Sequence, residues 1–600
     1  MKKIFLLVAF WLQAGYFIAQ TPYSKEVEEQ IKQVENNITG RIVLNDEKPS
    51  TIVERMAKYN VKGLSIAVIY DHKIAWAKAY GSADEAEKKP MTTETLFEPG
   101  SISKSLNALG ILKLAQDKKV DLNTDINHYL LSWKFPYDSL SKEKKITLTH
   151  LLSHNAGLTV HGFPGHDINA PIPTVLEVLD GKKPSFTPAV RSMYEPGLKF
   201  QYSGGGTTIS QLLLTDVTKQ IYDVWMYENI LKPIGMVNSS YSQPPSKDKR
   251  ALCASAYRSD GTPVANKFHV YPEQGAAGLW MTPSDLCNYI IDMQLAYQGK
   301  PSKVLNPEMV KLHLTPYNNG PTALGTFIED HGGAKYFQHG AGNDGFCGQF
   351  FGSLDDGYGV AIFMNTDDPK LLPEVINSVA KTYNWKNFYQ APRLKKSVAV
   401  KDNILKTYEG VYVFENIWGV ILKKDDDYYL HSTGTYAKMY FSSPTGFFNE
   451  EFSSEKEFVK NDKGNVVGYT RKVGHIEHQK ATKVNADTLQ MKLEDLNAVC
   501  WVYIENKKFA EATPYLNRGL HLYPGDLVLL CNRAHVDLFT GNYKSAIDVY
   551  KAHFKETASN NMIWEEMIKE DFKYLKKQGF DSKAMDKVFA ELKLEKPEGY

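Results

Sequence analysis

The sequence is short of cysteine, of long apolar runs and of excess charge of either sign. Its five cysteines are an odd number with no regular spacing, which favours buried small hydrophobic residues over disulfides or metal ligands. Lysine plus arginine (70) and aspartate plus glutamate (69) nearly cancel, so charge gives no reason to expect nucleic acid or an acidic membrane surface as a partner. After the N-terminus no run reaches about 18 apolar residues, so we expect no stable membrane span in the mature protein.

The first 20 residues have the composition of a targeting segment. Lys2 and Lys3 precede an apolar stretch that is interrupted by Gln13. This stretch is short for a membrane span, and Ala19-Gln20 offers a cleavage point. We therefore predict a signal peptide over residues 1–20, with a membrane anchor as the alternative. The mature protein is accordingly expected in the periplasm or secreted.

Apolar runs predict strands at both ends of the next segment, with helices and loops between them. The first two runs flank the turn Asp71-His-Lys, which is typical of a β-hairpin. Residues 120–270 are mostly helix and loop, and strands return near residue 334. The order predicts an α+β domain over residues 21–395, with one antiparallel sheet flanked by helices and a helical lobe. Within it, residues 21–50 are expected to form a polar surface leader.

Two further regions follow an expected linker that begins at Ala391. Residues 405–488 contain short strands separated by turn residues, which predicts a small all-β barrel. Residues 490–600 are helical and show a period of 34 residues, which resembles tetratricopeptide repeats. The pairs that carry this period are Phe509 and Tyr543, Ala512 and Ala546, Leu516 and Tyr550, and Cys500 and Ala534. These repeats are expected either to bind a protein partner or to pack within the chain.

Ser101 and Lys104 lie at the start of an apolar helix, directly after the turn Pro99-Gly100. Residues three apart share a helical face, so this spacing places an amine beside a hydroxyl that could lose its proton. The alternative is a helix-capping serine with a solvated lysine. Three other Ser-x-x-Lys pairs lie in polar, charged context: Ser139–Lys142, Ser246–Lys249 and Ser453–Lys456. Context therefore selects Ser101 as the candidate nucleophile.

Two later stretches supply candidate partners for Ser101. Tyr202 lies in a glycine-rich loop ahead of an apolar helix, where a nearby cation would favour its phenolate or its hydrogen bond. The strand that ends in His339 continues into Gly340, Ala341 and Gly342, small residues whose N–H groups could polarise a carbonyl. The alternatives are a buried core tyrosine and a glycine-rich hairpin turn.

These three elements, in this order, resemble the superfamily of class C β-lactamases and DD-peptidases, which includes the family VIII esterases. The resemblance covers roughly residues 50–385 and extends to two lesser stretches, residues 146–158 and 278–286. It implies the fold of that superfamily for this part of the chain. It also implies a small-molecule or peptide substrate, which could derive from the cell wall.

The resemblance implies a role for each motif. Ser101 would be the acylated nucleophile, Lys104 would help to activate it, and Tyr202 would act as general base and then as acid. The oxyanion hole would consist of the N–H groups of Ser101 and Gly342. His339 stands where the superfamily's third motif carries lysine or histidine. The implied substrate-binding set is completed by Ser203, Gly340 and Ala341, and the mechanism implies no metal and no cofactor.

Two departures from the superfamily put the substrate in doubt. Gly204 stands where the tyrosine motif usually ends in asparagine, and the third motif is His-Gly-Ala instead of Lys-Thr-Gly. Both changes shift weight from penicillin hydrolysis toward an esterase, a peptidase or an amidase. The sequence therefore predicts an exported serine hydrolase that forms an acyl-enzyme with an amide or ester. The alternative is a catalytically weak penicillin-binding-like protein that acts as a peptidoglycan- or partner-binding module.

The β region and the scattered histidines show no catalytic or ligand-binding motif. The β region resembles the lipocalin-like C-terminal domain attached to many such hydrolases, and it shows no ligand motif. The scattered histidines lack the spacing of metal ligands, so we expect them to be structural: His150, His154, His161 and His166.

Overall fold

The computed structural model describes residues 23–415, 417–432, 434–450, 454–473, 476–488, 491–558, 562–597 and 599–600. The predicted signal peptide lies outside the described residues. Within these ranges, no helix is both long and apolar enough to cross a membrane. The chain divides into two compact units, one of residues 1–39 and 48–391 and the other of residues 40–47 and 392–600.

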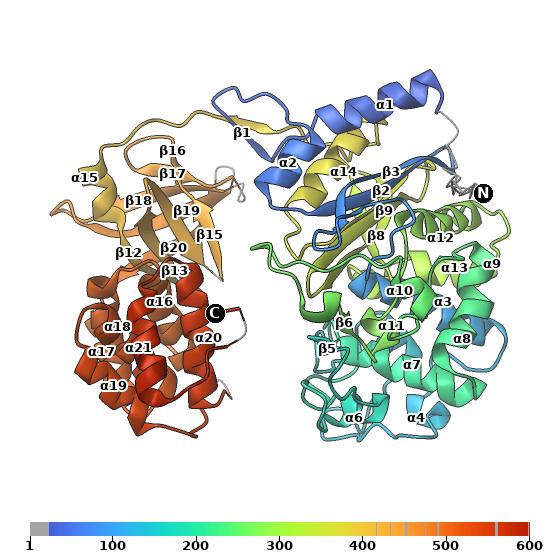
Figure 1. Cartoon of the computed structure of the whole chain (residues 1–600). Coiled ribbons are helices and arrows are strands. Elements are labelled where there is room, and N and C mark those ends of the chain that lie inside the picture. Colours follow the sequence, from blue (N-terminus) through green and yellow to red (C-terminus); the bar gives the residue numbers. More distant parts are fainter. Residues whose placement is uncertain are drawn as a thin grey trace, which may run out of the picture. The chain divides into compact units, whose positions relative to one another are not determined.

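The first unit is built on an antiparallel sheet with the strand order β4-β3-β2-β10-β9-β8-β7 (Figure 1). The strands are β2 (Gly63–Tyr70), β3 (Lys73–Asp84), β4 (Lys89–Pro90), β7 (Phe327–His331), β8 (Ala334–Asn343), β9 (Phe346–Ser353) and β10 (Gly359–Met364). The predicted hairpin is confirmed, because β2 and β3 pair across the turn after Tyr70. The strand β10, far along the chain, lies between β2 and β9.

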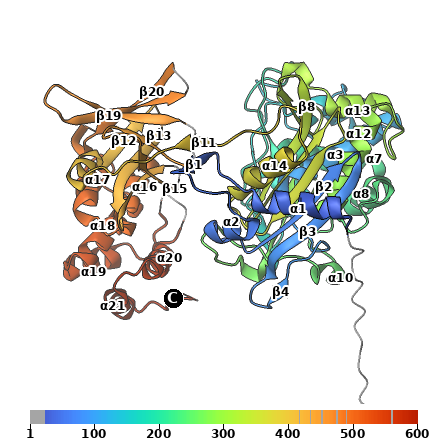
Figure 2. The same ribbon diagram turned by 90° about the horizontal axis from the view of Figure 1, so that it is seen from above.

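Both faces of this sheet are covered, so its central strands are apolar at nearly every position. Successive side chains of a strand point to opposite faces. On β2, Ile66 and Val68 belong to the core under α1 (Lys25–Asn36) and α14 (Leu371–Thr382), whereas Ala67 and Ile69 belong to the larger core on the other face. Figures 1 and 2 show α1 and α14 on one side of the strands and α12 (Pro283–Tyr297) on the other.

The larger core extends into a helical lobe. Its central helices, α3 (Ser103–Gln116) and α7 (Gly204–Thr218), are buried along nearly their whole lengths. The other helices of the first unit are α2 (Ile52–Lys58), α4 (Ile126–Tyr129), α5 (Leu148–Leu152), α6 (Val175–Asp180), α8 (Tyr222–Met226), α9 (Lys232–Ile234), α10 (Lys247–Arg250), α11 (Gln274–Ala277) and α13 (Pro307–Leu314). A short pair, β5 (His166–Asp167) and β6 (His269–Val270), joins two loops of the lobe.

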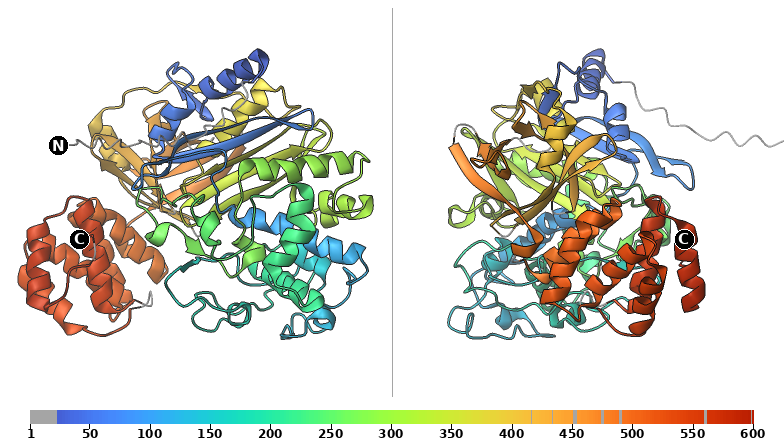
Figure 3. Two further views of the ribbon diagram at one scale, coloured as in Figure 1. Left: turned by 45° about the vertical axis from the view of Figure 1, so that its right-hand side comes forward. Right: turned by 90° about the vertical axis from the view of Figure 1, so that its left-hand side faces the viewer.

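The second unit begins with a strongly curved sheet (Figure 3). The strand order is β15-β14-β13-β12-β20-β19-β18-β17-β16, and the end strands β15 and β16 are joined in the chain by Met439, which nearly closes a barrel. The strands are β12 (Gly410–Phe414), β13 (Ile417–Lys424), β14 (Asp427–Ser432), β15 (Thr435–Lys438), β16 (Tyr440–Phe441), β17 (Gly446–Phe448), β18 (Glu455–Lys460), β19 (Val466–Val473) and β20 (Ile476–Val484). Aromatic side chains such as Tyr408, Tyr412 and Phe458 fill the interior.

Helices complete the second unit. The short helix α15 (Asp402–Leu405) precedes the barrel. The helices that follow it are α16 (Leu493–Glu505), α17 (Phe509–Leu522), α18 (Leu527–Phe539), α19 (Tyr543–Ala552), α20 (Trp564–Lys577) and α21 (Ser582–Leu592). Ala512 and its predicted equivalent Ala546 are both fully buried, as are Cys500 and Ala534. Barrel residues such as Val411 and Leu422 share one hydrophobic core with these helices.

The predicted fold class is confirmed, since an antiparallel sheet with helices is followed by a barrel and a helical region. Two local expectations need correction. The expected surface leader includes α1, which buries Ile31 and Val34 in the core beside α14. Residues 40–47 belong to the second unit, where β1 (Ile42–Leu44) pairs in parallel with β11 (Arg393–Lys395) inside the expected linker. Long-range pairing of this kind leaves no local signal in the sequence.

Candidate active site

A sharp turn presents Ser101 at the start of the buried helix α3. Gly100 has φ +45°, and a Cβ there would lie 2.8 Å from both the backbone nitrogen and the oxygen of Gly342. Only glycine combines this backbone conformation with so close an approach. The short 3₁₀ helix Gly100–Ile102 then leads into α3. Ser101 is partly exposed, whereas the residues after it are buried, so its hydroxyl lies where a substrate can reach it.

Lys104 is buried beside Ser101 without a carboxylate partner among its described contacts. Its Nζ lies 3.0 Å from Ser101 Oγ and 2.6 Å from the backbone oxygen of Ala276, and its exposed fraction is 4%. Burial disfavours the charged ammonium and lowers the pKa of Lys104 to about 7. A substantial fraction of this lysine is therefore a neutral amine at neutral pH, able to accept a proton.

Tyr202 faces the same pair of residues from the loop before α7. Its ring centroid lies 5.2 Å from Lys104 Nζ. Burial raises the pKa of Tyr202, and a hydrogen bond with Ser101 opposes this shift without cancelling it. The side chain is therefore a neutral phenol at neutral pH, which differs from the phenolate that a charged lysine would favour. Tyr202, predicted from a separate motif, is thus brought to Ser101 and Lys104.

Histidine rings pack around the side chain of Tyr202. His154 stacks on Tyr202 with the ring centroids 4.2 Å apart, and His161 lies 4.9 Å away. The Nδ1 atom of His154 accepts a hydrogen bond of 3.2 Å from the N–H of Ser203, which requires an unprotonated Nδ1. Burial, with help from nearby Lys104, lowers the pKa of His154 well below its ordinary value. His154 was expected to be structural, and its place against Tyr202 is what sequence reasoning missed.

The strand β8 brings the third predicted motif to the same place. His339 is buried, and its Nδ1 lies 2.8 Å from the backbone oxygen of Gly340. Burial, then the charge of Lys104, lowers the pKa of His339 to about 3, so its ring is neutral. In the described ladder, β7 pairs with β8 only as far as Gln338. Beyond Gln338, the edge of β8 opposite β9 therefore has no paired strand among the described residues. Ala341 and Gly342 lie on this part of β8, beside the Ser101 turn.

The exposed position of Gly342 fits the predicted oxyanion site. Gly342 is exposed, and a Cβ built there would meet no atom within 4 Å. Its backbone nevertheless touches the turn at Gly100, so its amide and that of Ser101 belong to neighbouring segments. A substrate carbonyl could approach this edge without a steric barrier.

Asn343 is a positioning residue that the sequence analysis did not single out. Its Nδ2 donates to Glu98 Oε2 at 3.2 Å and to the backbone oxygen of Ala277 at 3.1 Å. It thereby ties the end of β8 to the segment before Ser101 and to Ala277. The preceding residue, Ala276, accepts a hydrogen bond from Lys104. Burial raises the pKa of Glu98 well above its ordinary value, and the hydrogen bond from Asn343 opposes this shift. No sequence signal marks such a clamp, because its three segments are far apart in the chain.

Ser203 and Gly204 are occupied by the local fold. The hydroxyl of Ser203 donates to the backbone oxygen of Thr159 at 2.7 Å and accepts from the N–H of Gly206 at 3.0 Å, so it caps α7. A Cβ at Gly204 would lie 2.9 Å from the ring of Phe163 and 3.1 Å from the backbone oxygen of His161. Close packing of this loop on the helix explains why glycine stands where the superfamily carries asparagine.

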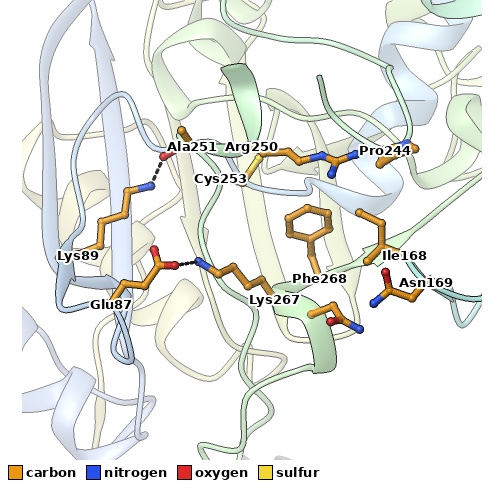
Figure 4. Close-up of a pocket in the computed structure, with 11 residues that line it drawn as sticks. Glu87, Lys89, Ile168, Asn169, Pro244, Arg250, Ala251, Cys253, Lys267 and Phe268 are labelled. Carbon is orange, nitrogen blue, oxygen red and sulfur yellow. Dashed lines mark hydrogen bonds and ion pairs between the residues drawn. The ribbon is translucent and has the colours of Figure 1, made fainter. Parts of the chain in front are cut away.

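A cavity of the first unit lies away from these residues (Figure 4). Its volume is about 670 Å³, and Lys89, Arg250 and Lys267 contribute to its lining. Figure 4 shows Lys89 bonded to the backbone oxygen of Ala251 and Lys267 paired with Glu87. None of the predicted site residues lines this cavity, and its lysines already have partners. The Ser101 site therefore remains the candidate active site.

Among the described residues, the Ser101 site holds no set of three side chains placed to bind one metal ion. The one such cluster in the described part of the chain is Cys531, His535 and Asp571, in the helical region. What the Ser101 site offers instead is a nucleophile, an amine of lowered pKa, a neutral phenol and an open strand edge. That set can transfer an acyl group without a metal.

The first unit is similar to known proteins. The family model described as Beta-lactamase matches residues 50–382. "Protein flp" of Staphylococcus aureus strain MRSA252 is 29% identical over 248 residues, which are 40% of this chain and 45% of that protein. A "Beta-lactamase" of Pseudomonas fluorescens is 28% identical over 256 residues, which are 42% of this chain and 65% of that one. The chain thus spans about half the length of the first of these curated relatives.

One solved structure shows the same fold at low sequence identity. It is the octameric penicillin-binding protein homologue from Pyrococcus abyssi, with a TM-score of 0.50 and 22% identity. The likeness covers 72% of this chain and 98% of that chain.

Proposed function

The chain belongs to the Beta-lactamase family, and we propose that it is an exported serine hydrolase that acts through an acyl-enzyme on an amide or ester. The observation that carries the proposal is the contact of 3.0 Å between Ser101 Oγ and Lys104 Nζ. Since burial lowers the pKa of Lys104 to about 7, the amine is placed and tuned to take the hydroxyl proton.

In the proposed acylation, neutral Lys104 accepts the proton of Ser101 while Oγ attacks the substrate carbonyl carbon. The N–H groups of Ser101 and Gly342 hold the oxyanion that develops. The neutral phenol of Tyr202 donates its proton to the leaving nitrogen or oxygen and regains one from Lys104. The bond between the carbonyl carbon and the leaving group breaks, and an ester to Ser101 remains.

Deacylation repeats these steps with water as the nucleophile. Water loses a proton to the Lys104–Tyr202 pair, attacks the ester carbonyl, and the proton returns to Ser101 Oγ as the acid leaves. This sequence assigns the base to Lys104 and the relay to Tyr202. It revises the expectation that Tyr202 is itself the first base, because burial keeps its phenol protonated.

The third motif, His339-Gly340-Ala341, carries no charge. This favours substrates that have no carboxylate beside it. The pKa of His339 is lowered to about 3, so the ring carries no charge with which to hold an anion. The place that an amide-binding asparagine would take is filled by the packing of Gly204 against Phe163. Both observations support an ester or a simple amide over a penicillin as the preferred acyl donor.

The test is hydrolysis and intact-mass measurement with a nitrophenyl ester, a D-alanyl-D-alanine peptide and a penicillin. We expect turnover of the ester, and a covalent adduct that disappears in Ser101→Ala. The matched control is Ser246→Ala, an exposed serine of another Ser-x-x-Lys pair, which should keep full activity.

Two outcomes would overturn the proposal. One is turnover that persists in Ser101→Ala. The other is an absence of both adduct and turnover with every substrate, and that result together with saturable penicillin or peptidoglycan binding would favour the binding-module alternative. Export is tested separately, by N-terminal sequencing of the mature protein, which should begin near residue 21.

A further inference from the structure

A second cluster of reactive side chains lies in the helical region, inside the second unit. Cys531 and His535 are buried on α18, and Asp571 lies on α20, with 25% of its side chain exposed. His535 Nε2 lies 3.0 Å from Asp571 Oδ2 and 3.6 Å from Cys531 Sγ, and Sγ lies 3.8 Å from Oδ2. A thiol, an imidazole and a carboxylate thus converge on one point.

The helices themselves create this convergence. Cys531 and His535 are four residues apart, so they share one face of α18. Asp571 faces them from α20, 36 residues beyond His535. The cluster therefore joins two helices that are not neighbours in the chain.

We propose that Cys531, His535 and Asp571 form a divalent metal site of the zinc type that ties α18 to α20. Thiolate, imidazole and carboxylate are the ligands that zinc takes in proteins, with bonds of about 2.0–2.3 Å. Ligand atoms around a tetrahedral ion with such bonds lie about 3.3–3.8 Å apart. The three distances between the ligand atoms are close to this range, so small shifts would admit an ion.

Charge balance also fits a divalent cation. A thiolate and a carboxylate together carry two negative charges, which one divalent ion neutralises in a buried place. Metal binding would release the thiol proton to solvent. Asp571 is partly exposed, so solvent reaches this side of the cluster, and water would supply the fourth ligand.

The surroundings of His535 resemble those of a metal-bound imidazole. Its Nδ1 lies 2.6 Å from the hydroxyl of Tyr550, which is fully buried on α19. Such a partner fixes the orientation of the ring and leaves Nε2 for the metal. The rings of Trp501 and Phe572 lie 6.1 and 5.4 Å from that of His535 and keep the site apolar.

A reactive thiol is the less favoured use of the cluster. Cys531 is only 1% exposed, and burial raises the pKa of its thiol well above the ordinary value. A cysteine nucleophile needs the opposite shift and access to its substrate. A metal overcomes the raised pKa by binding the thiolate directly.

The test uses the full-length protein, stripped with a chelator and then titrated with Zn²⁺ or Co²⁺ alone. We expect about one equivalent of bound metal, a melting temperature that rises with Zn²⁺, and a sulfur-to-cobalt charge-transfer band with Co²⁺. All three should be lost in Cys531→Ser and kept in Cys500→Ser, which removes another fully buried thiol of the same helical region. Tyr550→Phe should weaken metal affinity by about 10- to 100-fold.

The proposal is overturned if the wild type binds no metal, or if the cobalt band survives in Cys531→Ser. Either result would mean that the three side chains form a hydrogen-bonded cluster only. Should Cys531→Ser fail to fold, Asp571→Asn replaces it, because this change at a partly exposed position keeps the shape of the side chain.

Discussion

The Ser101 site and the Cys531 cluster both bury ionisable groups, but they differ in whether opposite charge accompanies them. Lys104 contacts the hydroxyl of Ser101 and a backbone oxygen, and burial is the cause of its lowered pKa. His535 instead lies against the carboxylate of Asp571. A buried amine without a counter-charge loses its proton readily and can act as a base. A buried imidazole that is hydrogen-bonded to a carboxylate keeps a fixed geometry, which suits the holding of a helix pair or an ion.

The largest effect separates the two sites by activity. Lys104→Met should lower kcat/KM for the ester by about 10²–10⁴-fold, the range of a lost general base. It should not lower the free energy of unfolding. The pKa of Lys104 is lower in the folded state, so below about pH 10 the buried amine disfavours folding, and its removal relieves that penalty. Steady-state kinetics and denaturant unfolding measure the two quantities.

Lys249→Met is the matched control for this variant, because Lys249 belongs to another Ser-x-x-Lys pair and bonds to backbone oxygens away from Ser101. It should leave the rate unchanged. If the Lys104→Met enzyme were fully active, Lys104 would not be the base. Burial without a counter-charge would then not distinguish the two sites.

The next effect concerns the proton relay. Tyr202→Phe should lower kcat by about 10²-fold, since it removes the hydroxyl that bonds to Ser101 and keeps the ring that packs on His154. Tyr222→Phe is the control, because that buried hydroxyl donates to Asn107 and does not contact Ser101. Equal rates in the two variants would leave Lys104 as the sole proton carrier.

At the Cys531 cluster we expect the opposite result, a loss of stability without a loss of activity. Asp571→Asn should lower the free energy of unfolding by about 1–3 kcal/mol, because the buried imidazole loses its charged partner. Ester hydrolysis per folded molecule should stay unchanged. Denaturant unfolding at fixed metal concentration and active-site titration would check this. A loss of activity without a loss of stability would contradict the separation of the two sites.

The smallest effect is a pH dependence. The neutral amine is the active form of Lys104, so kcat/KM should fall about tenfold per pH unit below about pH 7 and level off above it. Glu273 is a competing explanation, since burial also raises its pKa to about 7. The profile should therefore persist in Glu273→Gln. A rate that does not vary between pH 5 and 8 would contradict the assignment of the base.

Local patterns predicted much of the fold. Two apolar runs around Asp71 predicted the β2–β3 hairpin, and short strands separated by turn residues predicted the barrel. These features depend on neighbours within a few residues. The parallel pairing of β1 with β11 joins segments about 350 residues apart, and no local pattern in either segment predicts this pairing.

The candidate site divides in the same way. The motifs singled out Ser101, Tyr202 and His339, whereas His154 and Asn343 were missed as site residues. Their contribution is a contact with a distant segment, the stacking of His154 on Tyr202 and the bond of Asn343 to Glu98. The sequence left open whether Tyr202 is a phenolate or a hydrogen-bonded phenol, because its pKa depends on how deeply its loop is packed.

The sequence by itself determined that Ser101 and Lys104 meet, because the helical repeat places residues three apart on one face. It likewise placed Cys531 and His535 on one face of α18. Only the tertiary structure decided what these pairs can do. Ala276 and the surrounding core remove water from Lys104, and α20 brings Asp571 to His535. Desolvation and counter-charge are both supplied by distant segments, so the character of each site arises only when the chain is folded.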